Sequence, residues 1–329
     1  MVNLAETITT AFPSAKVAII GDIVADQYLN GTISRVSREA PVFILRHDQT
    51  TTLPGAAANA AANVASLGGQ ACIVGVIGND VNGKLLLDGM TRTGVDVSYV
   101  VVDPAASTTT KVRILAGQQH AARQQVIRVD YENSSPYTDA GRRKLIDNAI
   151  AAACSADAII FSDYNYGAAD AETFAAIKKI ATTERRIPLL VDSRFRLKVF
   201  CGASSATPNQ DEVEQILGPG FGDDACERLR EELGLDSLLV TNGNKGMTLI
   251  EKDCPPHQID AVGSDQAVDV TGAGDTVIAT FALGLASGLS YSEAARLANH
   301  AGGIVVMKKG TATVAPDELI GSINAIANR

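Results

Sequence analysis

Short apolar runs alternate with longer alanine-rich stretches along most of this chain. The runs are continuous in apolar residues, which is the pattern of strands that are buried on both faces of a parallel sheet. The stretches between them have the spacing of helices. This succession predicts an α/β fold with three layers, in which helices cover both faces of a doubly wound, mostly parallel sheet. The predicted strands are Lys16–Val24, Ala71–Ile77, Ala158–Ser162, Pro188–Asp192 and Ser237–Thr241.

Several of the intervening helices have recognisable patterns. Ala56–Leu67 is followed by two glycines, which commonly end a helix. Asp170–Thr182 is amphipathic, and Val277–Ser287 reads as a further helical run. Ser290–Glu293 has the Ser-x-x-Glu spacing of a capping box, so we expect a helix from there to about Val306.

Residues 30–50 and 98–131 do not follow this succession. Polar and apolar residues alternate in Lys111–Leu115 and Gln125–Asp130, as they do in antiparallel strands with one solvated face. We therefore expect a small β-sheet, a lid, that projects from the main body. No internal repeat or low-complexity linker separates the lid from the rest, so one domain is expected over residues 1–329. The unpaired edges of exposed lid strands further predict a homodimer through the lid.

The overall composition excludes several classes of protein. The net charge of −9 disfavours binding to nucleic-acid phosphates. No apolar stretch approaches the ~18 residues that span a bilayer, and Met1–Ser14 lacks the basic and apolar regions of a secretory signal. The five cysteines include no C-x-x-C pair, and the four histidines lack metal-ligand spacing. We predict a reduced, cytoplasmic protein that binds neither nucleic acid nor membrane.

The segment Asp269–Thr276 (DVTGAGDT) carries the strongest functional signal. Its small residues let the backbone approach a ligand closely, and the N–H groups at the start of the following helix form an anion site. Asp275 would lie beside a bound phosphate and could accept the proton of an acceptor hydroxyl. The alternative is a glycine-rich turn in which the same carboxylate only caps a helix.

Asp269–Thr276 resembles the C-terminal signature of the ribokinase-like (PfkB) carbohydrate kinases. Three other segments resemble motifs of that family and occur in the family's order. Pro54–Asn59 resembles its N-terminal signature, Ile77–Gly83 its G-x-D-x-x-G motif and Thr207–Glu212 its N-x-x-E motif. The resemblance covers essentially the whole chain, and it implies a ribokinase-like fold and an ATP- and Mg²⁺-dependent sugar kinase.

The resemblance also implies roles for individual residues around the transferred phosphate and the sugar. Asp275 would be the catalytic base. The anion hole for the transferring phosphate would be formed by the backbone of Gly272, Ala273 and Gly274. Contacts to the sugar would come from Asp22, Asp26, Gly55 and Asn59.

A second set of implied roles concerns ATP and metal ions. Magnesium and the ATP phosphates would be held, through water, by Asn209 and Glu212. The nucleotide would lie against Thr241, Gly243, Gly246 and Asn299. A monovalent cation such as K⁺ is bound in some members of the family at the positions of Asp269 and Thr271.

Within the family, the sequence most resembles D-glycero-β-D-manno-heptose-7-phosphate kinases. The segments behind this resemblance include Gly31–Val42, Thr110–Arg113, Ile127–Asp130, Ser162–Tyr164 and Lys309–Thr311. Such enzymes transfer the γ-phosphate of ATP to the anomeric hydroxyl and produce the 1,7-bisphosphate.

A substrate that already carries a phosphate needs cations on the sugar side of the cleft. Lys111 and Arg113 share one strand face by their spacing, and with Arg128 they could clamp the distal phosphate. The alternative is that these charges only keep the lid strands soluble.

Three departures from the heptose kinases keep other readings open. Ala56 replaces the second glycine of the usual pair, Tyr166 stands where a lysine is common, and Arg194 replaces the lysine of Asp-Pro-Lys. The alternatives are a kinase for another sugar, such as ribose, fructose or a ketodeoxy sugar acid, and a catalytically silent regulator that binds sugar or nucleotide.

Overall fold

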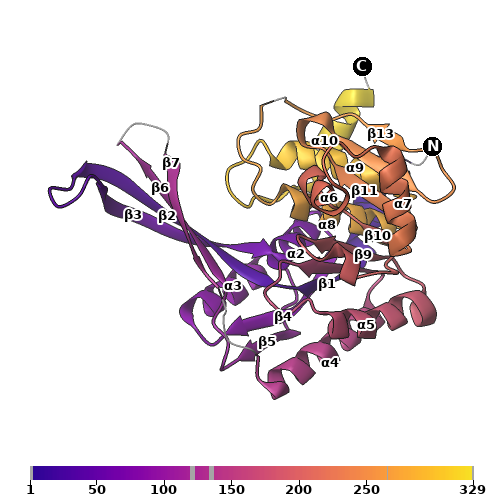
Figure 1. Ribbon diagram of the computed structural model, residues 1–329, viewed down its shortest axis with the longest axis horizontal. Coiled ribbons are helices and arrows are strands. Elements are labelled where there is room, and N and C mark those ends of the chain that lie inside the picture. The colour runs from indigo at the N-terminus through magenta and orange to yellow at the C-terminus, as the bar shows by residue number, and fades with distance from the viewer. Residues whose placement is uncertain (1–2, 119–122, 133–136, 265, 328–329) are drawn as a thin grey trace.

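A large, mostly parallel sheet forms the middle layer of the computed structural model, which describes residues 3–118, 123–132, 137–264 and 266–327 (Figure 1). Its strands are parallel from β5 to β11, and β12 and β13 continue the sheet in antiparallel pairing. All five predicted strands are present, with bounds shifted by at most a few residues. In spatial order the strands are β13 (His257–Ile259), β12 (Met247–Glu251), β11 (Ser237–Thr241), β10 (Ser205–Ala206), β9 (Leu189–Ser193), β8 (Ala158–Asp163), β1 (Lys16–Gly21), β4 (Gln70–Gly78) and β5 (Val100–Asp103).

Helices cover both faces of this sheet, and a separate apolar core lies on each side. The predicted three-layer α/β architecture is therefore confirmed. On one face lie α1 (Leu4–Thr10), α2 (Ala57–Ser66), α3 (Val81–Arg92), α8 (Ala273–Ala286), α9 (Tyr291–Val305) and α10 (Pro316–Ala327). On the other lie α4 (Asp139–Ser155), α5 (Ala171–Lys179), α6 (Gln210–Leu217) and α7 (Asp223–Leu233). Among the described residues, no helix is long and apolar enough to cross a membrane.

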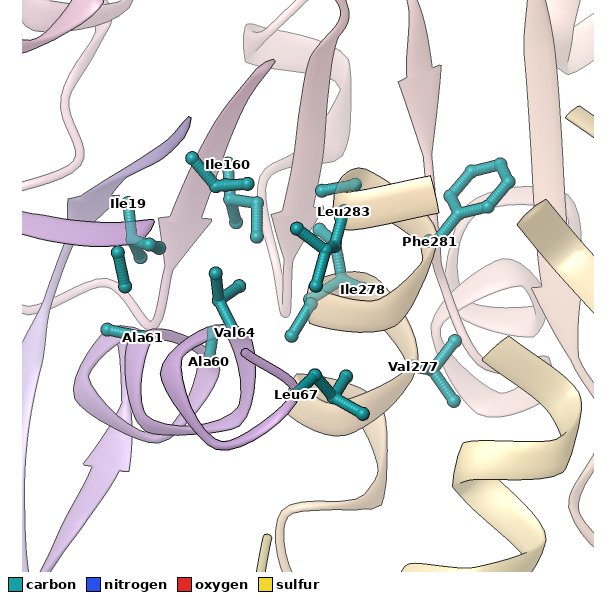
Figure 2. Packing of buried hydrophobic residues seen from close by; sticks show 14 of the residues in the cluster. Ile19, Ala60, Ala61, Val64, Leu67, Ile160, Val277, Ile278, Phe281 and Leu283 are labelled. Carbon is teal, nitrogen blue, oxygen red and sulfur yellow. The ribbon is translucent and has the colours of Figure 1, made fainter. Parts of the chain in front are cut away.

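Two of these helices, α2 and α8, pack side by side and carry the motifs singled out in the sequence. Figure 2 shows Ala60, Ala61 and Val64 of α2 turned toward Ile19 of β1, with Leu283 of α8 beside them. The small alanine side chains let α2 lie close to the sheet and to its neighbour. The N-terminal ends of both helices are thereby held near one another, which fixes the two main motifs in one place.

The start of α8 differs from the prediction. It begins at Ala273, whereas the sequence predicted a helix from Val277. Gly272 precedes it with a φ of +77°, a conformation that favours glycine. At α9 the predicted capping box of Ser290 and Glu293 is present and starts the helix as expected.

A second sheet of four strands projects from the main body (Figure 1). In spatial order it contains β3 (Phe43–Ala56), β2 (Ile23–Val36), β6 (Thr110–Gly117) and β7 (Gln124–Tyr131). These strands extend beyond the predicted interval 30–50 at both ends. Within the interval 98–131, β5 is not part of this sheet, because its continuous apolar run pairs in parallel with β4. Residues 119–122 of that interval lie outside the described residues.

The register of the small sheet separates its two faces. Arg113 pairs with Tyr28 on one side and Arg128 on the other, so these three side chains share a face. Ile114 pairs with Leu29 and Ile127, which makes the opposite face apolar. The polar face borders the cavity described below, and the apolar face lies on the other side of the sheet.

Candidate active site

Asp275 lies at the first turn of α8, buried with 3% of its surface exposed. Each oxygen of its carboxylate accepts one hydrogen bond. The Asn59 amide donates to Oδ2 at 2.8 Å, and the Tyr164 hydroxyl donates to Oδ1 at 2.9 Å. Burial raises the pKa of Asp275 to about 6, although these two hydrogen bonds lower it in part. A carboxylate with that pKa is mostly ionised at neutral pH and accepts a proton more readily than a solvated one.

The helix start beside Asp275 has the backbone geometry expected for an anion site. Gly272 cannot be replaced without a clash, because a Cβ there would lie 2.4 Å from the Asn59 amide nitrogen. The amide of Ala273 donates to the carbonyl of Val270 at 3.2 Å, so it is occupied by a turn. Within the described residues, the amide of Gly274 has no recorded acceptor, which leaves it available to a phosphate.

Asp22, which was predicted to bind sugar hydroxyls, has hydrogen-bond partners within the protein. Its buried carboxylate accepts hydrogen bonds from the backbone amides of Tyr164, Tyr166 and Ala168 at 2.9, 3.0 and 2.9 Å. Burial raises the pKa of Asp22 and outweighs the lowering by these bonds. The side chain therefore holds the loop that follows β8. Its sugar contact stays a prediction.

Asp26 lies on β2, at the base of the small sheet. Its Oδ1 accepts a hydrogen bond from Arg113 at 3.1 Å, and burial raises its pKa in spite of this cation. Gly55 lies directly against it, since a Cβ at that position would meet Asp26 Oδ2 at 2.4 Å. Asp26 and Gly55, both predicted to contact the sugar, are thus direct neighbours, and the lack of a side chain at Gly55 makes room for the buried carboxylate.

The three predicted phosphate-clamp residues share one face of the small sheet and their charges all act on the Asp26 carboxylate, but their closest contacts differ. Lys111 is buried and its Nζ lies 5.3 and 5.5 Å from the ring centroids of Tyr164 and Tyr166. Burial lowers the pKa of Lys111. Arg113 pairs with Asp26 instead, and Arg128 pairs with Asp130 at 2.9 Å on the exposed strand β7.

A polar cavity of about 190 Å³ adjoins Asp275 and the start of α8. Three further carboxylates, of Asp163, Asp192 and Glu212, line it, together with the guanidinium of Arg194. Burial and the neighbouring carboxylates raise the pKa of Asp192 well above its usual range. Such a crowded group of carboxylates favours a bound cation. The cavity is lined by Asp163, Tyr164, Asp192, Arg194, Thr207, Asn209, Glu212, Thr241, Val270, Gly272, Ala273, Gly274 and Asp275.

Asn209 and Glu212 also have a structural role at the start of α6. They form a reciprocal capping box, in which each side chain accepts the other's backbone N–H at 2.9 Å. The box uses one oxygen of each side chain. Asn209 Nδ2 and Glu212 Oε1 remain outside it, so capping and ligand binding are compatible at this pair.

A second, mostly apolar cavity of about 210 Å³ continues from the first along α8 and α9. All four predicted nucleotide residues, Thr241, Gly243, Gly246 and Asn299, line it. The Asn299 amide is held by the carbonyl of Asp260 at 2.8 Å. A mostly apolar cavity next to a polar one fits a nucleotide base and its phosphates.

A third and larger cavity, of about 890 Å³, opens between the small sheet and the 268–271 and 309–310 segments. Arg113, Arg123 and Lys309 bring positive charge to it. Asp269 borders it, and its carboxylate accepts hydrogen bonds from the backbone amides of Thr271 at 3.0 Å and Gly310 at 2.8 Å. Burial raises the pKa of Asp269, but these bonds outweigh it and leave a net lowering. The potassium site predicted at Asp269 and Thr271 stays a prediction.

A model of the pfkB family carbohydrate kinases matches residues 14–318 of this sequence. The chain belongs to that family. The bifunctional protein HldE of Shewanella piezotolerans (strain WP3 / JCM 13877) is 39% identical to this carbohydrate kinase over 319 residues, which make up 95% of this chain and 64% of HldE. This kinase therefore spans less than two thirds of the length of that relative.

Solved structures share the fold of this kinase. Arabidopsis thaliana ribokinase, complexed with ribose and ATP, matches with a TM-score of 0.70 and 22% identity, over 94% of this chain and 98% of that one. Phosphofructokinase-2 from Escherichia coli, in complex with potassium, matches with a TM-score of 0.76 and 17% identity, over 95% and 99%. The ribokinase-like fold predicted from the sequence is confirmed.

Sequence reasoning on this kinase assigned no role to four residues that border the cavities. Tyr164, Asp192 and Arg194 stand in segments singled out by the sequence patterns, and Arg123 lies in the predicted lid, but no pattern indicates a role for their side chains. What could have indicated a role is the position of these residues relative to the predicted strands. Tyr164 and Arg194 follow the carboxyl ends of β8 and β9, and ligands of open α/β sheets bind at this edge.

Proposed function

We propose that this carbohydrate kinase uses ATP and Mg²⁺ to phosphorylate the anomeric hydroxyl of D-glycero-β-D-manno-heptose 7-phosphate. The observation that carries the proposal is the cavity of about 890 Å³ with cationic side chains at its rim, since a distal sugar phosphate needs such a place. The resemblance of several segments to heptose-7-phosphate kinases supports the same substrate.

The reaction follows from the arrangement around Asp275. The anomeric oxygen attacks the γ-phosphorus of ATP, its proton passes to the Asp275 carboxylate, and the bond from that phosphorus to the ADP oxygen breaks. The amide of Gly274 and the Arg194 guanidinium line the same cavity as Asp275, and in this proposal they would stabilise the negative charge that gathers on the phosphate. The small sheet would act as a lid that excludes water from the cleft.

The donor set of the polar cavity fits Mg²⁺. Asp192 and Glu212 offer carboxylate oxygens, and the pKa of Asp192 is raised first by burial and then by like charges that a cation would relieve. Among the described residues, no group of three His, Cys, Asp or Glu side chains converges as a complete metal cage. This suits Mg²⁺, which keeps several waters and binds substrate phosphates. The ion would shield the phosphate charge and orient the transferred group. K⁺ near Asp269 and Thr271 is a further part of the proposal.

The substrate phosphate would lie against Arg113 and Lys309 at the rim of the large cavity. Lys111 would instead face the reacting end of the sugar, because its Nζ lies near Tyr164 and its charge acts on Asp275. The proposal thus gives two roles to residues of the predicted clamp, Lys111 at the reacting end of the sugar and Arg113 at the distal phosphate.

The proposal is tested by ADP release with Mg-ATP and a panel of heptose 7-phosphate, hexose phosphates and free sugars. We expect turnover on heptose 7-phosphate, and Asp275→Asn should lower it by at least ~10²-fold. Lys309→Ala should raise KM for the phosphorylated sugar with little change in KM for ATP. Preference for an unphosphorylated sugar would contradict the heptose assignment, and silence across the panel with ATP still bound would favour a regulator.

A further inference from the structure

The hydroxyl of Tyr164 stands beside the reacting oxygens of Asp275. It donates a hydrogen bond of 2.9 Å to Asp275 Oδ1, while Oδ2 is held by Asn59. A tyrosine hydroxyl carries one proton, so in this bond Tyr164 is the donor and the carboxylate the acceptor. A donated hydrogen bond stabilises the ionised carboxylate relative to the protonated one.

The loop that carries Tyr164 is anchored from two sides. Asp22 accepts the backbone amides of Tyr164, Tyr166 and Ala168. Asp163, the preceding residue, is fully buried at its side chain and is paired with Arg196. These anchors come from strands β1 and β8 and the segment after β9, so the phenol is held by the rigid sheet edge.

We propose that Tyr164 is a positioning residue for the base. Its hydroxyl fixes the orientation of the Asp275 carboxylate and favours the ionised form that accepts the substrate proton. Asp22 supports this role by fixing the Tyr164 backbone. The inference rests on the proposed function only for the identity of the proton donor, because the hydrogen bond itself does not depend on the substrate.

The charges around Asp275 show why such a donor matters. Burial is the main cause of its raised pKa, and the Asp26 carboxylate on the small sheet raises it further. Asp192 on β9 is a second like charge. Lys111 opposes them, but its own burial lowers its pKa. The Arg194 guanidinium, which lines the same cavity as Asp275, is a second cation. The Tyr164 hydroxyl therefore acts in the same direction as these two cations, and its removal should raise the pKa of Asp275.

The test compares two phenol-to-phenyl changes in the same loop. Tyr164→Phe removes the hydroxyl at Asp275 and keeps the ring below Lys111 Nζ. Tyr166→Phe is the matched control, because its hydroxyl contacts Glu132 at 3.4 Å and not the base. Protein labelled with carbon-13 at the aspartate carboxyl is titrated by NMR, and the resonance missing from Asp275→Asn identifies the base.

We expect a midpoint near 6 in the unaltered protein, an increase of about one pH unit in Tyr164→Phe, and no change in Tyr166→Phe. An unchanged midpoint in Tyr164→Phe, or an equal shift in both variants, would overturn the inference. The acidic limb of kcat against pH should move by the same amount. A shifted NMR midpoint with an unmoved kinetic limb would support the positioning role and contradict the assignment of Asp275 as base.

Discussion

Asn59 and Asp275 are separated by 216 positions in the chain, yet the amide of the first donates a hydrogen bond of 2.8 Å to the carboxylate of the second. Asn59 is the only polar side chain between these two helix starts that touches both Asp275 and the Gly272 carbonyl in the described structure. Asn63, one turn further along α2, bonds to Asn59 and to Thr276. The two signature motifs of the family are therefore joined by a buried chain of hydrogen bonds.

This buried carboxylate should cost stability. The folded pKa of Asp275, about 6, lies above its ordinary value of 3.8, so folding favours the protonated form. The stability that this preference provides is present below about pH 4 and is lost as the pH rises through 6. Asp275→Asn, which cannot ionise, should therefore become more stable than the unaltered protein as the pH rises from about 4 through 6, and the gain should reach up to about 3 kcal/mol at pH 8.

Urea unfolding at a series of pH values measures this difference. Asp88→Asn, on the exposed surface of α3, serves as the control and should follow the unaltered protein at every pH. A constant difference in unfolding free energy between Asp275→Asn and the unaltered protein across the whole pH range would show that the pKa of Asp275 is not raised by folding.

Ala56 occupies a conformation that suits glycine. Its φ is 54° and its ψ is −131°, at the residue that precedes α2. A side chain in such a region costs about 1–3 kcal/mol, whereas the greater freedom of glycine in the unfolded chain costs about 0.4–1 kcal/mol. Ala56→Gly should therefore stabilise the protein by about 1 kcal/mol.

The comparison is with Ala60→Gly, inside the same helix, which should destabilise by about 1 kcal/mol or more because it weakens a helix interior and the core beside Ile19. Chemical denaturation of both variants at one pH provides the test. Equal losses in both would mean that the backbone at Ala56 is not strained.

The sequence predicts the features of this molecule that depend on neighbouring residues, and it does not predict those that depend on contacts between distant parts of the chain. The strands and helix ends follow from local patterns, and the motifs locate Asp275 and the nucleotide residues. The partners of Asp22 could not be predicted, since they lie 142 to 146 positions away and are backbone amides without residue identity. Likewise β5 belongs to the large sheet because it pairs with β4, and its short apolar run is only a weak indication of that pairing.

Arg194 should act on the transferred phosphate. It faces the cavity that holds Asp275, and its charge acts on Asp192 and Glu212. In the described structure Arg194 forms no ion pair, whereas Arg196 is paired with Asp163. Arg194→Ala should lower kcat by about 10²-fold, as for the loss of one donor to a charged transition state.

Steady-state kinetics with varied ATP and sugar separate this effect from a change in binding. Arg194→Lys should recover part of the loss because it keeps the charge but not the planar fork. Lys198→Ala removes a nearby cation that pairs with Glu232 at 2.8 Å and should leave kcat unchanged. A change of kcat below about twofold in Arg194→Ala would remove Arg194 from the mechanism.

The apolar face of the small sheet should pair with that of a second copy. Ile127, Val129 and Tyr131 on β7 are 53%, 37% and 62% exposed, and the register places them beside Val112 and Ile114 of β6. An apolar sheet face of this kind favours burial against a partner.

We expect a mass of twice 34.3 kDa by light scattering, and a monomer for Ile127→Asp. Val199→Asp, which charges an apolar residue that is 49% exposed on the main body after β9, should remain dimeric. A mass of one chain at every protein concentration would contradict the dimer, and loss of the dimer in Val199→Asp would place its interface elsewhere.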